Sequence, residues 1–564
     1  LTVPRSKVVR GFSFFGVSFV YVIFEEGTDI YWARSRVLEY LSAASRNLPQ
    51  GVVPTLGPDA TGVGWVYQYA VMAKKRNLAE LRSTQDWQVR FAVAKAEGVA
   101  EVASVGGFVR QYSVVVDPRR LRAFDIPLAK VREAIRESNM DVGGRVVELA
   151  ETEFMVRGRG YLKGIADIES IVLKAEGGTP VLVKDVAHVE LTPDERRGVT
   201  ELNGEGEVVS GIAVQRYGQN ALDVIDNVKT QIEAIKSSLP DGTDIIPVYD
   251  RSELIHRAIN TLKVTLIEES LIVALVCVVF LLHVRSAFVA ILTLPLGILI
   301  AYIFMHALGL SSNIMSLGGI AIAIGAMIDA AIVMIENAHK HLERAPPDKP
   351  RTEILIEAAS EVGPPLFFSL LIITVSFLPI FALEAQEGRL FHPLAYTKTF
   401  AMAAAAFLSV TVVPALMIIF VRGRIIPEHK NPVNRFLIWA YRPMIRGVLK
   451  AKTLTIFVAL AILAGSAWPA SKLGSEFMPP LDEGDLLHMP SALPGLSAGK
   501  ASQLLQQMDR LLMSVPEVHR VFGKMGRAET ATDPAPLEMV ETTVQFKPRD
   551  QWRPGMTPEK LVEE

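Results

Sequence analysis

The chain has 564 residues, of which 50% are hydrophobic and 21% are charged. Its 58 basic and 60 acidic residues leave a formal net charge of −2, which gives no sign of a nucleic-acid-binding surface. The single cysteine, Cys277, excludes an intrachain disulfide, a cysteine-based zinc site and a thiol redox pair.

Residues 1–260 alternate short strand and helix signals. They begin with the strand SFVYVIFEE and the helix WARSRVLEYLSAASRNLP, and they end with the strand EVVSGIAVQRY and the helix ALDVIDNVKTQIEAIKSSLP. Such βαβ units with glycine-rich turns predict two small α+β subdomains of the split βαβ, ferredoxin-like type. The first residues, LTVPRSKVVRGFSFFG, contain neither an apolar signal region nor an initiator methionine. We therefore expect an internal piece of a longer protein, with a spanning helix ahead of it.

Six apolar segments of about 17–22 residues are long enough to span a membrane as helices. They are Val264–Leu282, Ala287–Leu308, Ile314–Ile335, Pro365–Leu383, Phe400–Val421 and Leu454–Ala470. We assign five of them to a membrane region, residues 261–421, and the sixth to residues 454–470.

Lys and Arg are distributed unequally between the connections. Thirteen lie in residues 283–286, 336–364 and 422–453, whereas two lie in residues 309–313 and 384–399 together. The positive-inside rule makes the thirteen-charge side cytoplasmic, so residues 1–260 and those after Ala470 lie on the other side.

The cytoplasmic connection, residues 422–453, contains the amphipathic segment NRFLIWAYRPMIRGVLK. We predict that this segment is a helix lying on the inner membrane surface. An ordinary basic loop is the alternative, which Pro443 favours because proline interrupts helices.

The third apolar segment contains ionisable groups: GGIAIAIGAMIDAAIVMIEN carries Asp329 inside it and Glu336 at its end. A carboxylate within a spanning helix costs roughly 2.5–3.5 kcal/mol on insertion scales and often marks a proton or ion route. The alternative is a structural carboxylate that hydrogen-bonds to a neighbouring helix.

Residues 471–564 repeat the strand and helix signals in DLLHMPSAL, SAGKASQLLQQMDRLLMSV, EVHRVFGKMG and MVETTVQFKP. We predict the start of a second outer region here. Outer regions on both sides of six spans indicate internal duplication, which is common in transporters. The last residues, PEKLVEE, look like the opening of a further helix.

Several motifs together resemble the heavy-metal branch of the resistance-nodulation-division exporters. They are LSSNIMSLGGIAIAIGAMIDAAIVMIENAHKHLE, GPDATGVGW, FLLHVRSAFVAI, ETATDPAPLEMVETT and QWRPGM. The resemblance implies a homotrimer in the inner membrane of a Gram-negative bacterium, with periplasmic porter domains and proton-driven metal export. It also implies a periplasmic adaptor (membrane fusion) protein and an outer-membrane channel as partners, no permanent cofactor, and spans two to seven of twelve in this chain.

The resemblance places Met489 and Met539 at two of three positions of the porter-domain metal site in the copper and silver pumps of this branch. Neutral thioethers are soft ligands that suit Cu(I) and Ag(I), which would be the transported ions. Both residues lie in strand-like stretches, so two strands could aim their sulfur atoms at one ion. His488 is either an extra ligand or part of the strand surface.

The same comparison places Met315, Met327, Met334 and Met402 on a proposed path of the ion through the membrane. Met327 and Met334 share a helix face, whereas Asp329 points about 200° away from Met327. One helix could thus serve metal on one face and protons on the other. The alternative is that these methionines only fill gaps in a core.

Asp329 matches the essential aspartate of the family's fourth helix, and we expect it to take up and release protons. Glu336 either joins this relay or caps the helix end. Glu195, in PDERRG, stands where the copper pumps have a methionine, which leaves open an exporter of divalent Zn, Co or Cd.

Two further alternatives are an exporter of hydrophobic organic compounds and a non-transporting membrane scaffold or truncated remnant. An enzyme is not supported, because the sequence contains no nucleotide-binding loop, nucleophile elbow or His-rich metal motif.

Overall fold

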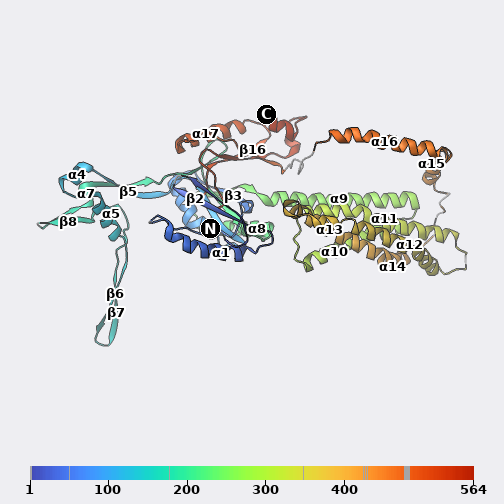
Figure 1. Cartoon of the computed structure of the whole chain (residues 1–564), viewed down its shortest axis with the longest axis horizontal. Coiled ribbons are helices and arrows are strands. Elements are labelled where there is room, and N and C mark those ends of the chain that lie inside the picture. Colours follow the sequence, from blue (N-terminus) through green and yellow to red (C-terminus); the bar gives the residue numbers. More distant parts are fainter. Residues whose placement is uncertain are drawn as a thin grey trace. The chain divides into compact units, whose positions relative to one another are not determined.

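A computed structural model of the chain describes residues 3–14, 16–49, 51–176, 178–346, 348–423, 425, 427, 430–474 and 483–564. The chain forms two compact units. Unit 1 consists of Leu1–Asp250 together with Gly484–Glu564, and unit 2 consists of Arg251–Glu483 (Figure 1).

Unit 1 contains a four-stranded antiparallel sheet with the strand order β14-β3-β13-β4. Its strands are β3 (Trp65–Ala73), β4 (Val99–Gly106), β13 (Val209–Gln215) and β14 (Thr243–Asp250). The helices α2 (Leu78–Thr84) and α3 (Arg90–Val93) connect β3 to β4, and α8 (Ala221–Ile235) connects β13 to β14. Two βαβ connections with this strand order make a split βαβ unit.

The helices cover one face of this sheet because each presents an apolar side to it. Ile225 and Val228 of α8 pack with Tyr69 and Val71 of β3 in one fully buried cluster. The side chain of Asn220 caps α8 by accepting a hydrogen bond from the Leu222 amide at 3.0 Å.

A second, five-stranded antiparallel sheet has the strand order β12-β11-β16-β17-β15. Its strands are β11 (Gly198–Leu202), β12 (Gly206–Glu207), β15 (Asp485–His488), β16 (Val518–Gly526) and β17 (Val540–Phe546), and α17 (Ala498–Leu512) packs on it. The sequence predicts that residues 471–564 start a second outer region. In the structure β16 pairs with β11, so Gly484–Glu564 belongs to the same compact unit as the first 250 residues.

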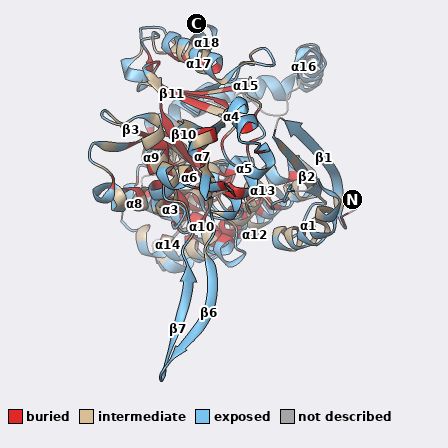
Figure 2. Cartoon of the chain, turned by 90° about the vertical axis from the view of Figure 1, so that its left-hand side faces the viewer, coloured by how far each residue is buried: buried red, intermediate tan, exposed pale blue. Residues whose placement is uncertain are grey.

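The two sheets share a small core, in which Ala70 and Val248 of the first pack with Leu202 and Phe522 of the second. Hairpins and short helices complete unit 1. These are β1 (Ser6–Phe14), β2 (Val17–Phe24), α1 (Ile30–Ala44), β5 (Arg110–Val116), α4 (Pro118–Ala123), α5 (Leu128–Glu137), β6 (Val142–Leu149), β7 (Thr152–Gly158), α6 (Ile165–Glu169), β8 (Val172–Glu176), β9 (Thr179–Leu182), α7 (Val183–Val186), β10 (Ala187–Pro193) and α18 (Pro558–Glu563). Figure 2 shows that the β6–β7 hairpin is exposed along its whole length.

Unit 2 is helical. Its helices are α9 (Arg251–Leu281), α10 (Val284–Ala307), α11 (Ile314–Arg344), α12 (Arg351–Val375), α13 (Ala385–Val410), α14 (Val412–Phe420), α15 (Pro432–Lys450) and α16 (Lys452–Lys472). Among the described residues, four helices are long and apolar enough to cross a membrane, or five if one bent pair counts as a single span. The expected span Val264–Leu282 lies in α9 except for its last residue, and α9 is not among these helices.

Two helices differ from the segments expected from the sequence. The segment Phe400–Val421 is divided between α13 and α14, and the two helices form an angle of 50°. Pro414 explains the break, because it donates no hydrogen bond to the Val410 carbonyl and its ring clashes with it. The segment Pro365–Leu383 begins inside α12, which starts at Arg351, contains two prolines and ends at Val375, and it continues into a short 3₁₀ helix, Leu378–Ala382.

The amphipathic segment of residues 434–450 lies in α15, which continues through Pro443 and buries no residue. This segment is therefore a helix, as predicted, and not a basic loop. Residues 424, 426, 428 and 429 of the expected cytoplasmic connection, and residues 475–482 of the expected second outer region, lie outside the described residues.

Candidate metal and proton sites

The strands β15 and β17 bring Met489 and Met539 to one face of the five-stranded sheet. The pairs His488↔Thr542 and Ser491↔Met539 belong to one continuous antiparallel register. In this register Met489 lies opposite Glu541, and Met539 lies two residues from Glu541 on the same strand. The two methionines are therefore diagonal neighbours, a spacing that long side chains bridge.

Backbone hydrogen bonds fix this arrangement. The Val540 amide donates to the Pro490 carbonyl at 3.1 Å, and the Gly526 amide donates to the Met539 carbonyl at 3.0 Å. The Met489 side chain is 46% exposed, and that of Met539 is half-buried. His488 precedes Met489 along the strand, so its exposed side chain points to the opposite face.

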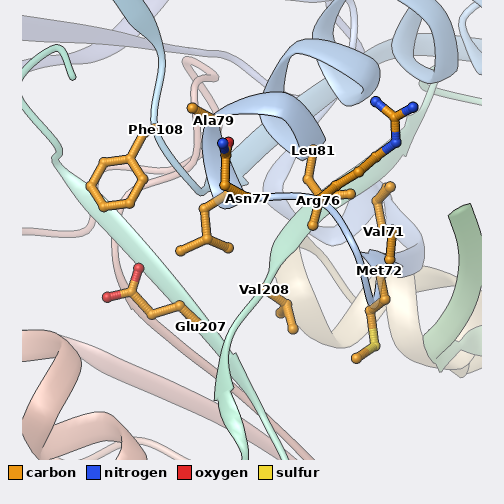
Figure 3. A pocket seen from close by; sticks show the side chains of 11 residues that line it. Val71, Met72, Arg76, Asn77, Ala79, Leu81, Phe108, Glu207 and Val208 are labelled. Carbon is orange, nitrogen blue, oxygen red and sulfur yellow. The ribbon is translucent and has the colours of Figure 1, made fainter. Parts of the chain in front are cut away.

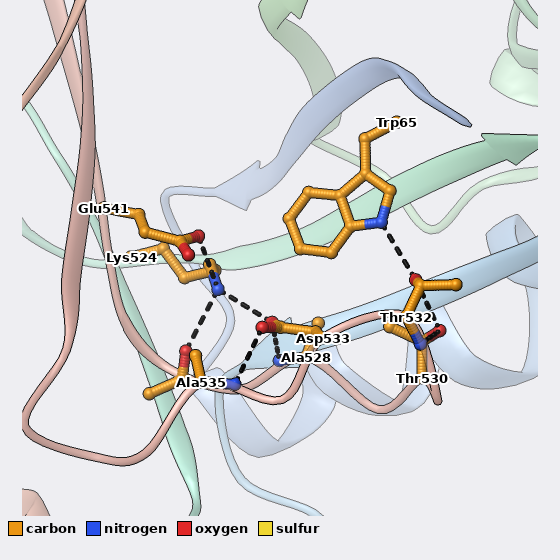
Figure 4. Close-up of polar contacts among 9 residues, drawn as sticks. Trp65, Lys524, Ala528, Thr530, Thr532, Asp533, Ala535 and Glu541 are labelled. Atoms are coloured by element: carbon orange, nitrogen blue, oxygen red, sulfur yellow. Dashed lines mark hydrogen bonds and ion pairs between the residues drawn. The ribbon is translucent and has the colours of Figure 1, made fainter. Parts of the chain in front are cut away.

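Figure 4 shows a charge cluster around Lys524, and one of its members, Glu541, lies opposite Met489 in the strand register. Lys524 of β16 is 3% exposed, and its Nζ atom lies 2.7 Å from carboxylate oxygens of both Asp533 and Glu541. Its ammonium group also lies 5.3 Å from the centre of a Trp65 ring. The Glu541 carboxylate, which forms an ion pair with Lys524, therefore lies next to the two thioethers.

Replacing Lys524 by Met is expected to destabilise unit 1 by about 3 kcal/mol or more, because it leaves the buried charge of Asp533 uncompensated. The urea midpoint of the complete purified protein, followed by tryptophan fluorescence, measures this loss. Replacing Lys236 by Met is the control, since its ion pair with Glu233 is a surface contact that is worth less than about 1 kcal/mol. Equal midpoints for the two variants would show that the cluster does not stabilise the fold.

Helix α11 separates its carboxylate from its methionines. The helix begins with a capping box in which Asn313 accepts a hydrogen bond from the Ser316 amide at 2.9 Å. Met327 and Met334 are buried, whereas the side chain of Asp329 is exposed. The structure thus gives the helix the two different faces that the 3.6-residue period predicts.

Three of the four membrane methionines lie in one apolar core. Met327, Met334 and Met402 belong to this cluster, and the side chains of Met334 and Met402 are completely buried. Gly297 makes room for Met327, because a Cβ atom there would collide with the Met327 methyl group. Met315, near the start of α11, is half-buried and is not part of the cluster.

Two further predicted carboxylates lie at ordinary ion pairs. Glu336 is half-buried and accepts a hydrogen bond from Lys340 at 2.6 Å, one turn further along α11. Glu195 is exposed and forms an ion pair with Arg197 at 2.7 Å.

A cavity of about 550 Å³ lies elsewhere in unit 1, between β3, α2 and the segment around Val208 (Figure 3). Arg76, Phe108 and Glu207 line it, but none of the predicted site residues does. Glu207 is already bound by Arg196 at 2.5 Å and by the Ser502 hydroxyl. This cavity is therefore separate from the thioether pair.

Two buried carboxyl groups that the sequence does not predict as a pair are Asp509 of α17 and Glu201 of β11, which are 0% and 1% exposed. The Glu201 carboxylate accepts hydrogen bonds from the Gly204 and Gly206 amides at 2.8 and 2.7 Å. Burial, and the hydrogen bond and negative charge of Glu201, raise the pKa of Asp509 well above its usual range. The raised pKa indicates that Asp509 holds a proton at neutral pH, which the neighbouring Glu201 carboxylate can accept as a hydrogen bond. No local pattern reveals this pair, because its members are distant in sequence.

Since the folded state holds this proton at a pH where the unfolded chain has lost it, the stability of unit 1 should fall as the pH rises from the ordinary aspartate pKa towards the raised one. In this range the free energy of unfolding should fall by about 1.4 kcal/mol per pH unit. Asp509→Asn, whose amide donates a similar hydrogen bond, should remove this slope and be at least as stable at pH 8. Urea midpoints between pH 5 and pH 9 test this, and an unchanged slope in the variant would contradict it.

The chain belongs to the AcrB/AcrD/AcrF family, whose model matches residues 2–564. Cation efflux system protein CusA of Escherichia coli K12 is 58% identical over 575 residues, which cover 100% of this chain and 55% of that protein. The putative cation efflux system protein SilA of Salmonella typhimurium is 56% identical with the same coverage.

A crystal structure of a heavy metal efflux pump matches with a TM-score of 0.87 at 31% identity, covering 100% of this chain and 54% of that chain. The chain thus spans about half the length of the relatives that it matches. The resemblance to the heavy-metal branch of the resistance-nodulation-division transporters, predicted from the motifs, is confirmed.

Proposed function

We propose that the complete protein exports the monovalent soft ions Cu(I) and Ag(I) across the inner membrane of a Gram-negative bacterium in exchange for protons. It acts as a homotrimer and as the pump subunit of a tripartite system, with a periplasmic adaptor and an outer-membrane channel. The metal ion is its substrate, and the protein itself is a secondary transporter rather than an enzyme.

The placement of Met489 and Met539 carries this proposal. Two strands present two thioethers on one face of a sheet, and one of these side chains is accessible. Thioethers bind Cu(I) and Ag(I) in preference to harder divalent ions. In this proposal Met489 and Met539 hold the ion, and the resemblance puts the third ligand beyond Glu564.

The two faces of α11 support the coupling of metal and protons. Asp329 binds and releases the driving proton on one face, and Glu336 continues the route along the same helix. Met327 and Met334 on the other face, with Met402 and Met315, pass the ion through the membrane. Separate faces keep a proton-carrying carboxylate away from soft-metal ligands.

Growth of a Gram-negative host that lacks its own metal pumps tests the substrate class. Expression of the complete protein with its adaptor and outer-membrane channel should raise tolerance to Ag(I) and Cu(I), and not tolerance to Zn(II), Co(II), Cd(II) or hydrophobic dyes. Tolerance to the divalent ions alone would favour the divalent exporter. Tolerance to dyes alone would favour export of organic compounds, and no change in tolerance would favour the scaffold.

A further inference from the structure

Two buried histidines and a buried serine form a continuous hydrogen-bonded chain at one end of the helical unit. His283 caps the start of α10, Ser286 lies in its first turn, and His339 lies in the last part of α11. His283 Nδ1 lies 2.7 Å from Ser286 Oγ, which in turn lies 2.7 Å from His339 Nε2. The side chains of His283, Ser286 and His339 are 9%, 0% and 6% exposed.

The far end of the chain fixes the direction of its hydrogen bonds. His283 Nε2 lies 2.9 Å from the Arg422 carbonyl oxygen, which only accepts, so this nitrogen carries a proton. With neutral imidazoles, His283 Nδ1 accepts from the Ser286 hydroxyl. Ser286 Oγ then accepts from His339 Nε2–H, and His339 Nδ1 remains the basic atom of the chain.

A proton can enter this chain without any other reagent. It binds at His339 Nδ1, the Nε2 proton of His339 passes to Ser286 Oγ, and the hydroxyl proton of Ser286 passes to His283 Nδ1. His283 then carries the positive charge, while Ser286 and His339 are again neutral. Histidine is suited to such an exchange because either ring nitrogen can hold or release a proton.

The chain adjoins a cavity of about 340 Å³ whose wall includes His339, Glu336, Lys340 and Glu343 of α11. Cys277 of α9 and Asn431 also line it, and the cavity is large enough for several waters at about 30 Å³ each.

The surrounding elements also contribute charged groups. Arg351, at the start of α12, places a positive charge near His339. Its guanidinium group donates a hydrogen bond to the Gly423 carbonyl at 3.0 Å. From α11, Glu336 is paired with Lys340. The connections at this end, residues 283–286, 336–364 and 422–453, are those that the Lys and Arg distribution assigns to the cytoplasm.

We propose that the His283–Ser286–His339 chain is a proton relay at the cytoplasmic end of the transport path, which exchanges protons with the cavity that adjoins His339. The inference rests on the proposed proton-coupled export. It adds three residues to that export and assigns them a role in proton transfer, separate from metal binding.

The experiment compares Ser286→Ala with wild type in vesicles that contain the complete protein, with Ag(I) as the probe. The variant removes only the bridging hydroxyl and keeps both imidazoles. We expect Ag(I)-coupled proton flux to fall about tenfold or more and to lose its pH inflection, with unchanged Ag(I) binding. Ser286→Thr, which keeps a hydroxyl, should restore the flux and its inflection.

Matched controls use residues outside the His283–Ser286–His339 chain. In Ser409→Ala the lost hydroxyl bonds only the Ala406 carbonyl of its own helix, and in His341→Gln the lost imidazole faces Glu361. Both should behave as wild type, whereas His339→Gln should behave as Ser286→Ala.

Wild-type flux and pH profile in Ser286→Ala and His339→Gln would overturn the relay. A loss of thermal stability in these variants without a change in the pH profile would also overturn it, because the chain would then be only a structural joint. Failure of the proposed function gives a different result, since wild type itself would then show no Ag(I)-coupled proton flux.

Discussion

Asp329→Asn in the complete protein should reduce Cu(I) and Ag(I) tolerance to the level of cells without the pump. The substitution keeps the size of the side chain but removes the proton that it binds and releases. Asp329 is exposed on α11, on a different face from the buried Met327 and Met334, so the change should disturb neither the core nor trimer assembly. Metal tolerance and the size of the detergent-solubilised assembly measure the two effects.

Glu357→Gln is the matched control for this substitution. Glu357 also lies on a helix of unit 2 and pairs with Lys349 through an exposed carboxylate. The control should retain full tolerance. Normal tolerance in Asp329→Asn would defeat the proton role of this carboxylate, whereas a dissociated trimer would show that it is structural.

The second large effect is expected at the thioether pair. Met489→Ile and Met539→Ile should each weaken Ag(I) binding to the complete protein at least about tenfold, or ~1.4 kcal/mol. Isoleucine has nearly the volume of methionine but offers no sulfur ligand. Because Met489 is 46% exposed, its replacement should hardly change stability.

Met155→Ile is the control for the thioether pair. Met155 is 88% exposed on the β7 strand of the hairpin and lies in the same unit. Its variant should bind Ag(I) as wild type does. Unaltered binding in Met489→Ile would remove this residue from the site.

Periodicity and length were sufficient to predict most elements. The strand β13 and the helix α8 lie where EVVSGIAVQRY and ALDVIDNVKTQIEAIKSSLP predicted them. The bend between α13 and α14 was not predicted, because Pro414 interrupts an apolar segment whose length alone suggests one straight span. The joining of β11 to β16 was missed because strand pairing between distant segments leaves no local pattern.

The candidate sites also include some features that the sequence predicts and others that only the structure reveals. The opposite faces of Asp329 and Met327 follow from the helical period and agree with the structure. The common face of Met489 and Met539 required the strand register. The Asp509–Glu201 pair and the His283–Ser286–His339 chain depend on contacts between distant segments, which a single sequence does not reveal.

The central claim is that soft-metal export and proton movement are coupled through Asp329. The complete protein in liposomes, with an imposed pH gradient, permits Ag(I) flux and proton flux to be measured together. We expect each flux to require the other in wild type, and both to cease in Asp329→Asn while Ag(I) still binds. Equal Ag(I) flux in the variant, or Ag(I) flux in wild type without proton movement, would contradict it.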